Sequence, residues 1–288
     1  MASTQQIRGR IKSVKNTRQI TKAMQLVSAS KLRRMQEAAA AAEVYSRYAR
    51  ELLTHLRAQD EAREFAFYTT KPVKNRLIII ITSDRGLAGA YNSNVLKTYV
   101  SELKNDRTAG VGNQTIVVGR QGANFVGRLQ TEISGVYTNL PDKPALSDLQ
   151  PAIQTAIKAF TDKEVEAVDV IYTHFISTIN QKVTVQRLLP AGFTDEEVSD
   201  SIANAEFEPS IEAVLETVTI RLIEAQFLQG VLESFVSEQA MRMVAMKNAT
   251  DNANDLVEDY TLELNNARQA AITQELAEIS GGVEALND

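Results

Sequence analysis

Apolar side chains recur every three to four residues along the last third of the chain, which predicts a helix from about Ser210 to Ile279. The stripe comprises Val214, Val218, Leu222, Ala225, Leu228, Leu232, Phe235, Gln239, Arg242, Met246, Ala249, Ala253, Leu256 and Tyr260. Its thirteen steps cover 46 residues, close to the ~3.5-residue repeat of a left-handed coiled coil. Gln239 and Arg242 interrupt it, and polar residues at such positions cost stability and can set register. Because the stripe thins beyond Tyr260, we expect the end of the helix to leave its partner.

The first part of the chain predicts a second long helix, from about Ser3 to Leu56. Its stripe comprises Ile7, Ile11, Val14, Met24, Val27, Leu32, Met35, Leu53 and Leu56. Arg18 and Thr21 stand where this stripe should be apolar, so we expect that turn to be exposed or to contact another protein. All six prolines lie between Pro72 and Pro209, which leaves both ends free to be helical. The two helices therefore most simply pair as an antiparallel coiled coil.

The middle of the chain alternates short apolar runs with helical patterns, as α/β domains do. Strands are predicted at 77–83, 115–118, 131–137, 168–175 and 183–189, and helices at 90–104, 121–129 and 147–161. Ser147 is the expected N-cap of the last of these helices. The sheet should be mainly parallel, but residues 177–182 are too few for a crossover helix, so the last two strands should be antiparallel. The predicted division is an N-terminal helix (1–70), a central α/β domain (71–208) and a C-terminal helix (209–288).

Charge is distributed unevenly, although the net charge is only −5. Residues 1–36 carry nine basic side chains and no acid, whereas residues 248–288 carry nine acids and one base, Arg268. A transit peptide and a nucleic-acid-binding arm both fit the basic end. We favour a third interpretation, in which the two ends pair with each other or meet charged surfaces of other proteins. The longest unbroken apolar run, Leu77–Ile81, is far shorter than the ~20 residues of a transmembrane helix.

Candidate chemistry is sparse. The chain has no cysteine, which excludes disulfides, thiolate zinc sites and cysteine nucleophiles. The segment from Ser83 to Asn92 joins a strand to a helix, where α/β proteins place ligands, but Gly86 and Gly89 lack the spacing of a phosphate-binding loop. A structural turn is therefore favoured, with Asp84 and Arg85 capping it or meeting a partner. His174 lies in an apolar strand and is expected to be a core residue. We predict a non-enzymatic chain that needs no cofactor and no metal.

Three segments resemble the γ subunit of F-type ATP synthases, in its compact bacterial-type form. They are 7–24 (IRGRIKSVKNTRQITKAM), 83–92 (SDRGLAGAYN), and the pair 243–253 (MVAMKNATDNA) and 267–279 (ARQAAITQELAEI). The resemblance spans the whole chain, and the terminal segments are highly specific. One departure is Gly282-Val283, where the family usually has Gly-Ala.

The resemblance implies a rotor shaft made of an antiparallel coiled coil and a Rossmann-like α/β foot domain. One copy per complex would contact the α and β subunits of the catalytic ring, the ε subunit and the c-subunit ring. The complex would sit at the cytoplasmic face of the bacterial inner membrane, and this subunit would bind no nucleic acid and break no bond.

Matching positions nominate the contacts with the α/β ring: Met24, Arg242, Arg268, Gln269, Thr273 and Glu275, with Lys12, Lys15, Arg18 and Lys22 facing acidic loops. The turn of the foot domain comprises Asp84, Arg85, Gly86 and Gly89. Two other hypotheses stay open: an α/β enzyme with helical dimerisation arms, which needs a ligand at the 84–92 turn, and a nucleic-acid-binding coiled coil, which needs steeply salt-dependent DNA binding.

Overall fold

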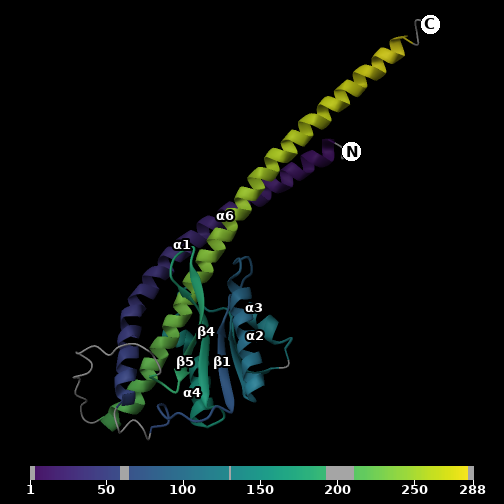
Figure 1. The fold of residues 1–288 in the computed structure, drawn as a ribbon. Helices are drawn as coiled ribbons and strands as arrows, with labels where there is room; N and C mark the ends of the chain where they lie inside the picture. The colour runs from purple at the N-terminus through teal and green to yellow at the C-terminus, as the bar shows by residue number, and fades with distance from the viewer. Residues whose placement is uncertain (1–3, 59–64, 130, 193–210, 285–288) are drawn as a thin grey trace. The chain divides into compact units, whose positions relative to one another are not determined.

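The computed structural model describes residues 4–58, 65–129, 131–192 and 211–284 (Figure 1). Its helices are α1 (Thr4–Ala58), α2 (Tyr91–Ala109), α3 (Arg120–Val126), α4 (Leu146–Thr161) and α6 (Ile211–Glu284). Its strands are β1 (Asn75–Ile81), β2 (Gly112–Val118), β3 (Glu132–Tyr137), β4 (Ala167–Phe175) and β5 (Gln181–Leu189). The predicted α/β fold with long terminal helices is confirmed. The predicted division between residues 208 and 209 lies outside the described residues.

By its contacts the chain divides into two compact units, and both long helices contribute to each. The terminal-helix unit contains Met1–Val27 and Met243–Asp288, so it consists of the start of α1 and the end of α6. The sheet unit contains Ser28–Arg242 and holds all five strands, α2, α3, α4 and the remaining parts of the long helices.

In the terminal-helix unit, α1 and α6 run antiparallel. Thr21 lies against Thr250, with 2.8 Å between their hydroxyl oxygens, and three residues earlier on α1 the Arg18 Nη1 donates to Asn254 Oδ1 at 3.2 Å. Thr21 itself is buried, so the expectation of an exposed position is wrong for this residue, whereas its neighbours Ile20 and Lys22 are exposed and contact of this turn with another protein stays a prediction. A threonine fits this helix contact because Thr250 supplies a hydroxyl partner, so the buried side chain does not have to be apolar.

The sheet of the second unit has the strand order β3-β2-β1-β4-β5. The first four strands pair in parallel, and β5 pairs antiparallel with β4. This arrangement confirms the predicted mainly parallel sheet and its terminal hairpin. From β1 the chain passes through α2 to β2 on one side of β1, whereas β4 lies on the other side. The strand order therefore reverses between β1 and β4. The carboxyl ends of two such strands are the usual place of a ligand in these folds.

Alternate residues of the central strand β1 enter two separate cores, as the two-residue period of a strand requires. Ile78 and Ile80 pack under α2 and α3. Leu77, Ile79 and Ile81 pack on the opposite face, against α4 and the sheet-unit parts of α1 and α6 (Figure 1). An all-apolar strand is the expected sequence for a position covered on both faces. The long helix α6 is therefore a layer of the domain as well as a coiled-coil strand.

The start of α4 differs from the prediction. The helix begins at Leu146, with Ala145 at the N-cap position, so Ser147 lies inside the first turn. The Asp148 carboxylate accepts a hydrogen bond from the Ala145 backbone N–H at 2.8 Å. An acidic side chain at the third helical position can satisfy the N-cap backbone in this way, and it also favours the positive end of the helix dipole.

A buried charge network crosses the amino-terminal half of the sheet. Arg76 of β1 donates to Asp169 of β4 at 2.5 Å and to Glu102 of α2 at 2.8 Å. Asp106 lies 3.2 Å from the same guanidinium, and Arg187 of β5 also donates to Asp169. Burial alone would lower the pKa of Arg76, but the surrounding carboxylates outweigh it and hold that pKa above its usual value. We call these five residues the charged network.

Three buried tyrosines give a prediction about alkaline pH. Burial raises the pKa of Tyr68 to about 12, and it also raises the pKa of Tyr91 and of Tyr99. For a tyrosine whose folded-state pKa lies above the unfolded value of ~10, the stability that its protonated form contributes is fully present below pH ~10. That contribution is lost as the pH rises through the folded-state pKa. Of the eight tyrosines, we expect Tyr68 and Tyr91 to stay protonated at about pH 11 while the chain is folded, and Tyr99 to ionise later than an exposed tyrosine.

The measurement is the ultraviolet absorbance of tyrosinate during an alkaline titration, with circular dichroism recorded in parallel. Tyr68→Phe should remove one late-titrating group and leave the others unchanged. Ionisation of all tyrosines in one early step, with the circular dichroism intact, would contradict the assignment.

Candidate functional site

The position at which α/β folds usually bind a ligand is covered by the chain's own helix α6. Ser234 Oγ accepts a hydrogen bond from the Thr173 backbone N–H at 2.8 Å, and Ser237 Oγ donates to the Thr173 carbonyl at 3.1 Å. Both serines are fully buried. The carboxyl end of β4 is thus fixed to α6 through its backbone, and a dinucleotide could not occupy this edge without displacing the helix.

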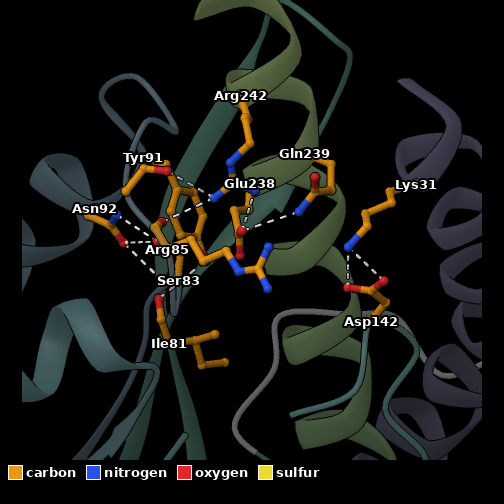
Figure 2. Close-up of polar contacts among 11 residues, drawn as sticks. Lys31, Ile81, Ser83, Arg85, Tyr91, Asn92, Asp142, Glu238, Gln239 and Arg242 are labelled. Carbon is orange, nitrogen blue, oxygen red and sulfur yellow. Dashed lines mark hydrogen bonds and ion pairs between the residues drawn. The ribbon is translucent and has the colours of Figure 1, made fainter. Parts of the chain in front are cut away.

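One turn further along α6, Arg242 binds the loop between β1 and α2. Its Nη2 donates to the carbonyl oxygens of Arg85 at 3.1 Å and Gly86 at 3.4 Å, while Nη1 donates to Glu238 at 2.6 Å (Figure 2). Only 7% of Arg242 is exposed. We call Arg242, Glu238 and these two carbonyl groups the clamp. Arg242 is therefore a buried partner of this loop, and its side chain does not extend into solvent.

The electrostatics of the clamp depend on Glu238. Burial raises the pKa of this carboxyl, while the Arg242 guanidinium counteracts the rise through its charge and its hydrogen bond. The carboxylate of Asp84 raises the same pKa further, and the ammonium group of Lys31 lowers it. Gln239 also donates to Glu238 at 3.2 Å. Glu238 and Arg242 therefore compensate each other in a buried setting, where neither would be stable alone.

The predicted turn of the foot domain is held by bonds within the chain. The Asp84 carboxylate accepts from the backbone N–H groups of Arg120 at 3.0 Å and Asn139 at 2.8 Å. Ser83 Oγ donates to the Arg85 carbonyl at 2.7 Å, and Asn92 bonds to Ser83 (Figure 2). The prediction of a structural turn with Asp84 as a cap agrees with these contacts. The same groups are not free to cradle a phosphate.

Glycines after β2 also serve packing. A Cβ on Gly119, which has a φ of +97°, would lie 2.1 Å from the Thr82 carbonyl oxygen. A Cβ on Gly122 would lie 2.7 Å from the Thr82 hydroxyl, which accepts the Gly122 N–H at 2.9 Å. Close approach of α3 to β1 therefore explains both glycines without a ligand.

An ion pair joins α1 to the segment between β3 and α4. Lys31 Nζ lies 2.7 Å from the Asp142 carboxylate, in the segment between β3 and α4 (Figure 2). This pair was not predicted, and nothing in the spacing of either residue indicates it. Because Asp142 is largely exposed, the pair contributes little stability by itself.

His174 is half-exposed, which corrects the expectation of a core residue. It lies near the end of β4, and its Nδ1 is 2.5 Å from a Glu233 carboxylate oxygen on α6. The pairing of β4 with β1 ends at Ile171, so His174 lies beyond the end of β1, where the strand has less cover than at the centre of the sheet.

The predicted contact residues at the start of α1 belong to the terminal-helix unit. Lys12, Lys15 and Lys22 are exposed, Met24 is half-buried, and Arg18 is half-buried against Asn254. Lys22 Nζ donates to the neighbouring Gln25 side chain at 3.2 Å. The outward surface of this segment is therefore basic.

The predicted contact residues at the end of α6 are all exposed: Arg268, Gln269, Thr273 and Glu275. Ala267 is the last partly buried residue in this helix among those whose side chains are described. The expectation that the helix end leaves its partner agrees with this pattern. Three large apolar side chains, Ile272, Leu276 and Ile279, are exposed on the same segment, and their spacing places them on one helix face.

Of the nominated residues, the structure joins Arg242 to the foot turn at Arg85 and Gly86 and places Asp84 nearby. Gly89, at a φ of +57°, is exposed in the same loop. Among the described residues there is no group of three or more histidine or acidic side chains that could hold a metal ion. No helix within the described ranges is long and apolar enough to cross a membrane.

Known proteins match the chain over nearly its whole length. The family model described as ATP synthase matches residues 3–286. The ATP synthase gamma chain of Ralstonia nicotianae is 39% identical over 293 residues, which cover 99% of this chain and 100% of that protein. The ATP synthase gamma chain of Cupriavidus necator is 40% identical over 291 residues, with the same coverage of both.

Solved structures agree with the fold. A chain of the central stalk and c ring of the Tetrahymena thermophila mitochondrial ATP synthase has a TM-score of 0.58 and 26% identity, covering 80% of this chain and 99% of that chain. A chain of the Euglena gracilis mitochondrial ATP synthase has a TM-score of 0.68 at 20% identity, covering 98% and 94%. The resemblance seen in the three sequence segments is confirmed, and the chain belongs to the ATP synthase gamma chain family.

Proposed function

We propose that this chain is the central rotor shaft of a proton-translocating F-type ATP synthase and couples rotation of the c-subunit ring to the catalytic sites of the β subunits. The observation that carries the proposal is full-length similarity to ATP synthase gamma chains at about 40% identity. The fold is consistent with it, because α6 is both a layer of the sheet unit and a strand of the coiled coil.

The mechanism requires no bond-breaking chemistry in this subunit. A rotor with different side chains around its axis presents a different surface to each β subunit and so stabilises different conformations of each. The exposed basic surface of α1 and the exposed end of α6 would make these contacts. Residues 1–70 and 209–288 would form the shaft, and residues 71–208 the foot that meets the ε subunit and the c-subunit ring. The foot would lie at the cytoplasmic face of the bacterial inner membrane.

The clamp has a clear role in such a machine. Torque delivered to the sheet unit must pass into α6. If only flexible surface contacts connected the two, part of the torque would deform those contacts and would not turn the helix. Arg242 donates hydrogen bonds to two main-chain carbonyls of the β1–α2 loop, and Ser234 and Ser237, which precede it on α6, bond to the backbone at the end of β4. The serine bonds are buried and the Arg242 bonds partly buried, and all four involve backbone groups, so they resist relative movement of helix and sheet.

Reconstitution tests the proposed function. The chain should co-purify with α and β subunits, and the ATPase activity of the resulting complex should depend on its presence. A chain that stays separate and leaves α/β activity unchanged would refute the proposal, and would return attention to a ligand for the α/β domain.

The basic surface of α1 gives a sharper prediction. Replacing Lys12, Lys15, Arg18 and Lys22 together by alanine should weaken assembly with the α/β ring by about tenfold, because exposed charge pairs contribute roughly 0.2–1 kcal/mol each. ATP-driven proton pumping should fall accordingly. A matched control, compared by its assembly with the α/β ring alone, replaces four exposed basic residues of the sheet unit, Lys104, Arg107, Lys143 and Lys158. Equal loss in the two variants would mean that net charge, and not this surface, is responsible.

A further inference from the structure

A polar cavity lies beside the hairpin of β4 and β5. Because β4 turns directly into β5, no crossover helix follows it to cover the side that faces α2. The cavity that remains has a volume of about 380 Å³ and lies between α2, β4, β5 and α6, entirely within the sheet unit. Its lining combines polar residues (Asn94, Thr98, Thr173 and Gln181) with Tyr91, Val183 and Met241 and two lysines.

The charge of the cavity has one sign. Lys97 of α2 and Lys182 of β5 are the charged residues of the lining, and it contains no carboxylate. Both lysines are exposed, and neither makes an ion pair with any described residue. Lysine ammonium groups bind phosphate and carboxylate groups as point charges. Two of them facing one cavity without acidic partners favour an anion.

Thr173 provides an independent observation. Its side chain lines the cavity and is 1% exposed, yet its Oγ1 has no hydrogen-bond partner. The backbone N–H and carbonyl of the same residue are bonded to Ser234 and Ser237, so the strand position is fixed. Buried hydroxyl groups are nearly always satisfied in folded proteins, and an orphan in the wall of a cavity needs an explanation. A bound oxygen that accepts this O–H would supply the missing partner.

We propose that this cavity is a binding site for a small oxyanion of the phosphate class, with Lys97 and Lys182 supplying the positive charge and Thr173 donating a hydrogen bond. The site does not depend on the proposed rotor function, since it lies within one unit of this chain. The anion can be free phosphate or the phosphate group of a nucleotide, and the experiment separates these two sources.

Calorimetric titration of the full-length chain with inorganic phosphate, at constant ionic strength, is the test. We expect saturable one-to-one binding that weakens at least about fivefold in Lys97→Gln and in Lys182→Gln, as loss of a charged contact predicts. Lys104→Gln is the matched control, because Lys104 is exposed on the same helix but outside this cavity. A parallel titration with ADP identifies the source of the phosphate. If ADP binds more tightly than inorganic phosphate and with the same dependence on Lys97, the site takes the phosphate of a nucleotide. If ADP does not bind while inorganic phosphate does, the site takes free phosphate.

Thr173→Val distinguishes binding from folding. The substitution is close to isosteric and removes an unsatisfied hydroxyl, so the phosphate-free variant should melt at the same temperature as the parent or higher. The rise in melting temperature that phosphate gives the parent should be reduced or lost. No saturable binding to the parent chain, equal weakening by Lys104→Gln, or an unchanged phosphate response in Thr173→Val would each overturn the proposal.

Discussion

Arg242→Met is expected to destabilise the sheet unit by about 3–5 kcal/mol at neutral to alkaline pH, because it leaves the buried Glu238 carboxylate without its counter-charge. The effect should depend on pH with a defined sign. Glu238 already has a pKa raised by burial, and Arg242 is the main group that opposes the rise. Without it the folded-state pKa moves further up, so the variant holds a proton at Glu238 over a wider range of pH.

A carboxyl whose pKa is raised on folding contributes most stability below its unfolded pKa, and that contribution is lost as the pH rises through the folded pKa. The deficit of Arg242→Met should therefore be smallest at acidic pH, where Glu238 is protonated in the folded variant, and should grow as the pH rises, with a slope no steeper than about 1.4 kcal/mol per pH unit for one proton. Urea unfolding of the full-length chain at several pH values measures it.

The double variant Arg242→Met with Glu238→Gln is the control. Removing the carboxylate charge should recover much of the lost stability and abolish the additional pH dependence. A deficit that is the same at every pH, or one that the second substitution does not reduce, would show that the guanidinium acts through packing or through the Arg85 and Gly86 carbonyls alone.

The periodic pattern was sufficient to predict the architecture. The stripe through α6 identified the helix and singled out Gln239 and Arg242 as polar interruptions, and the structure finds both buried. The all-apolar run of β1 identified the central strand, because a strand covered on both faces leaves no polar position. Two successive strands with a short connection identified the hairpin. Each of these features depends on residues close together in the sequence.

The missed features depend on residues far apart. Thr21 looks like an error in an apolar stripe until Thr250 is placed opposite it. The bonds from Arg242 to the Arg85 and Gly86 carbonyls could not be predicted, because they join residues 157 and 156 positions apart in the sequence. Helical spacing shows which face a residue occupies, but it does not show which loop or helix lies across from that face. The nominated contacts with the catalytic ring remain predictions for the same reason, since their partners belong to other chains.

Removing the negative charge of Asp169, at the centre of the charged network, should lower the free energy of unfolding about as much as Arg242→Met does. Asp169 is 2% exposed and accepts hydrogen bonds from both Arg76 and Arg187. Asp169→Asn preserves the shape of the side chain but replaces one accepting oxygen by an NH₂ group, which donates. This NH₂ group would then face an arginine N–H donor, and the positive charges of Arg76 and Arg187 would lose the carboxylate between them. We expect about 3–5 kcal/mol of destabilisation, measured by the urea midpoint of the sheet-unit transition at an unchanged slope.

Glu102→Gln is the matched control for this prediction. Glu102 bonds to the same guanidinium but is more exposed, with 23% of its side chain accessible, so its loss should cost about 1 kcal/mol or less. High salt separates the two further, because buried pairs are screened much less than exposed ones. The Asp169→Asn deficit should therefore persist in about 1 M salt. If the two variants were equally mild, β1, β4 and β5 would be held by their apolar faces and backbone ladder, and the charged network would only satisfy its own members.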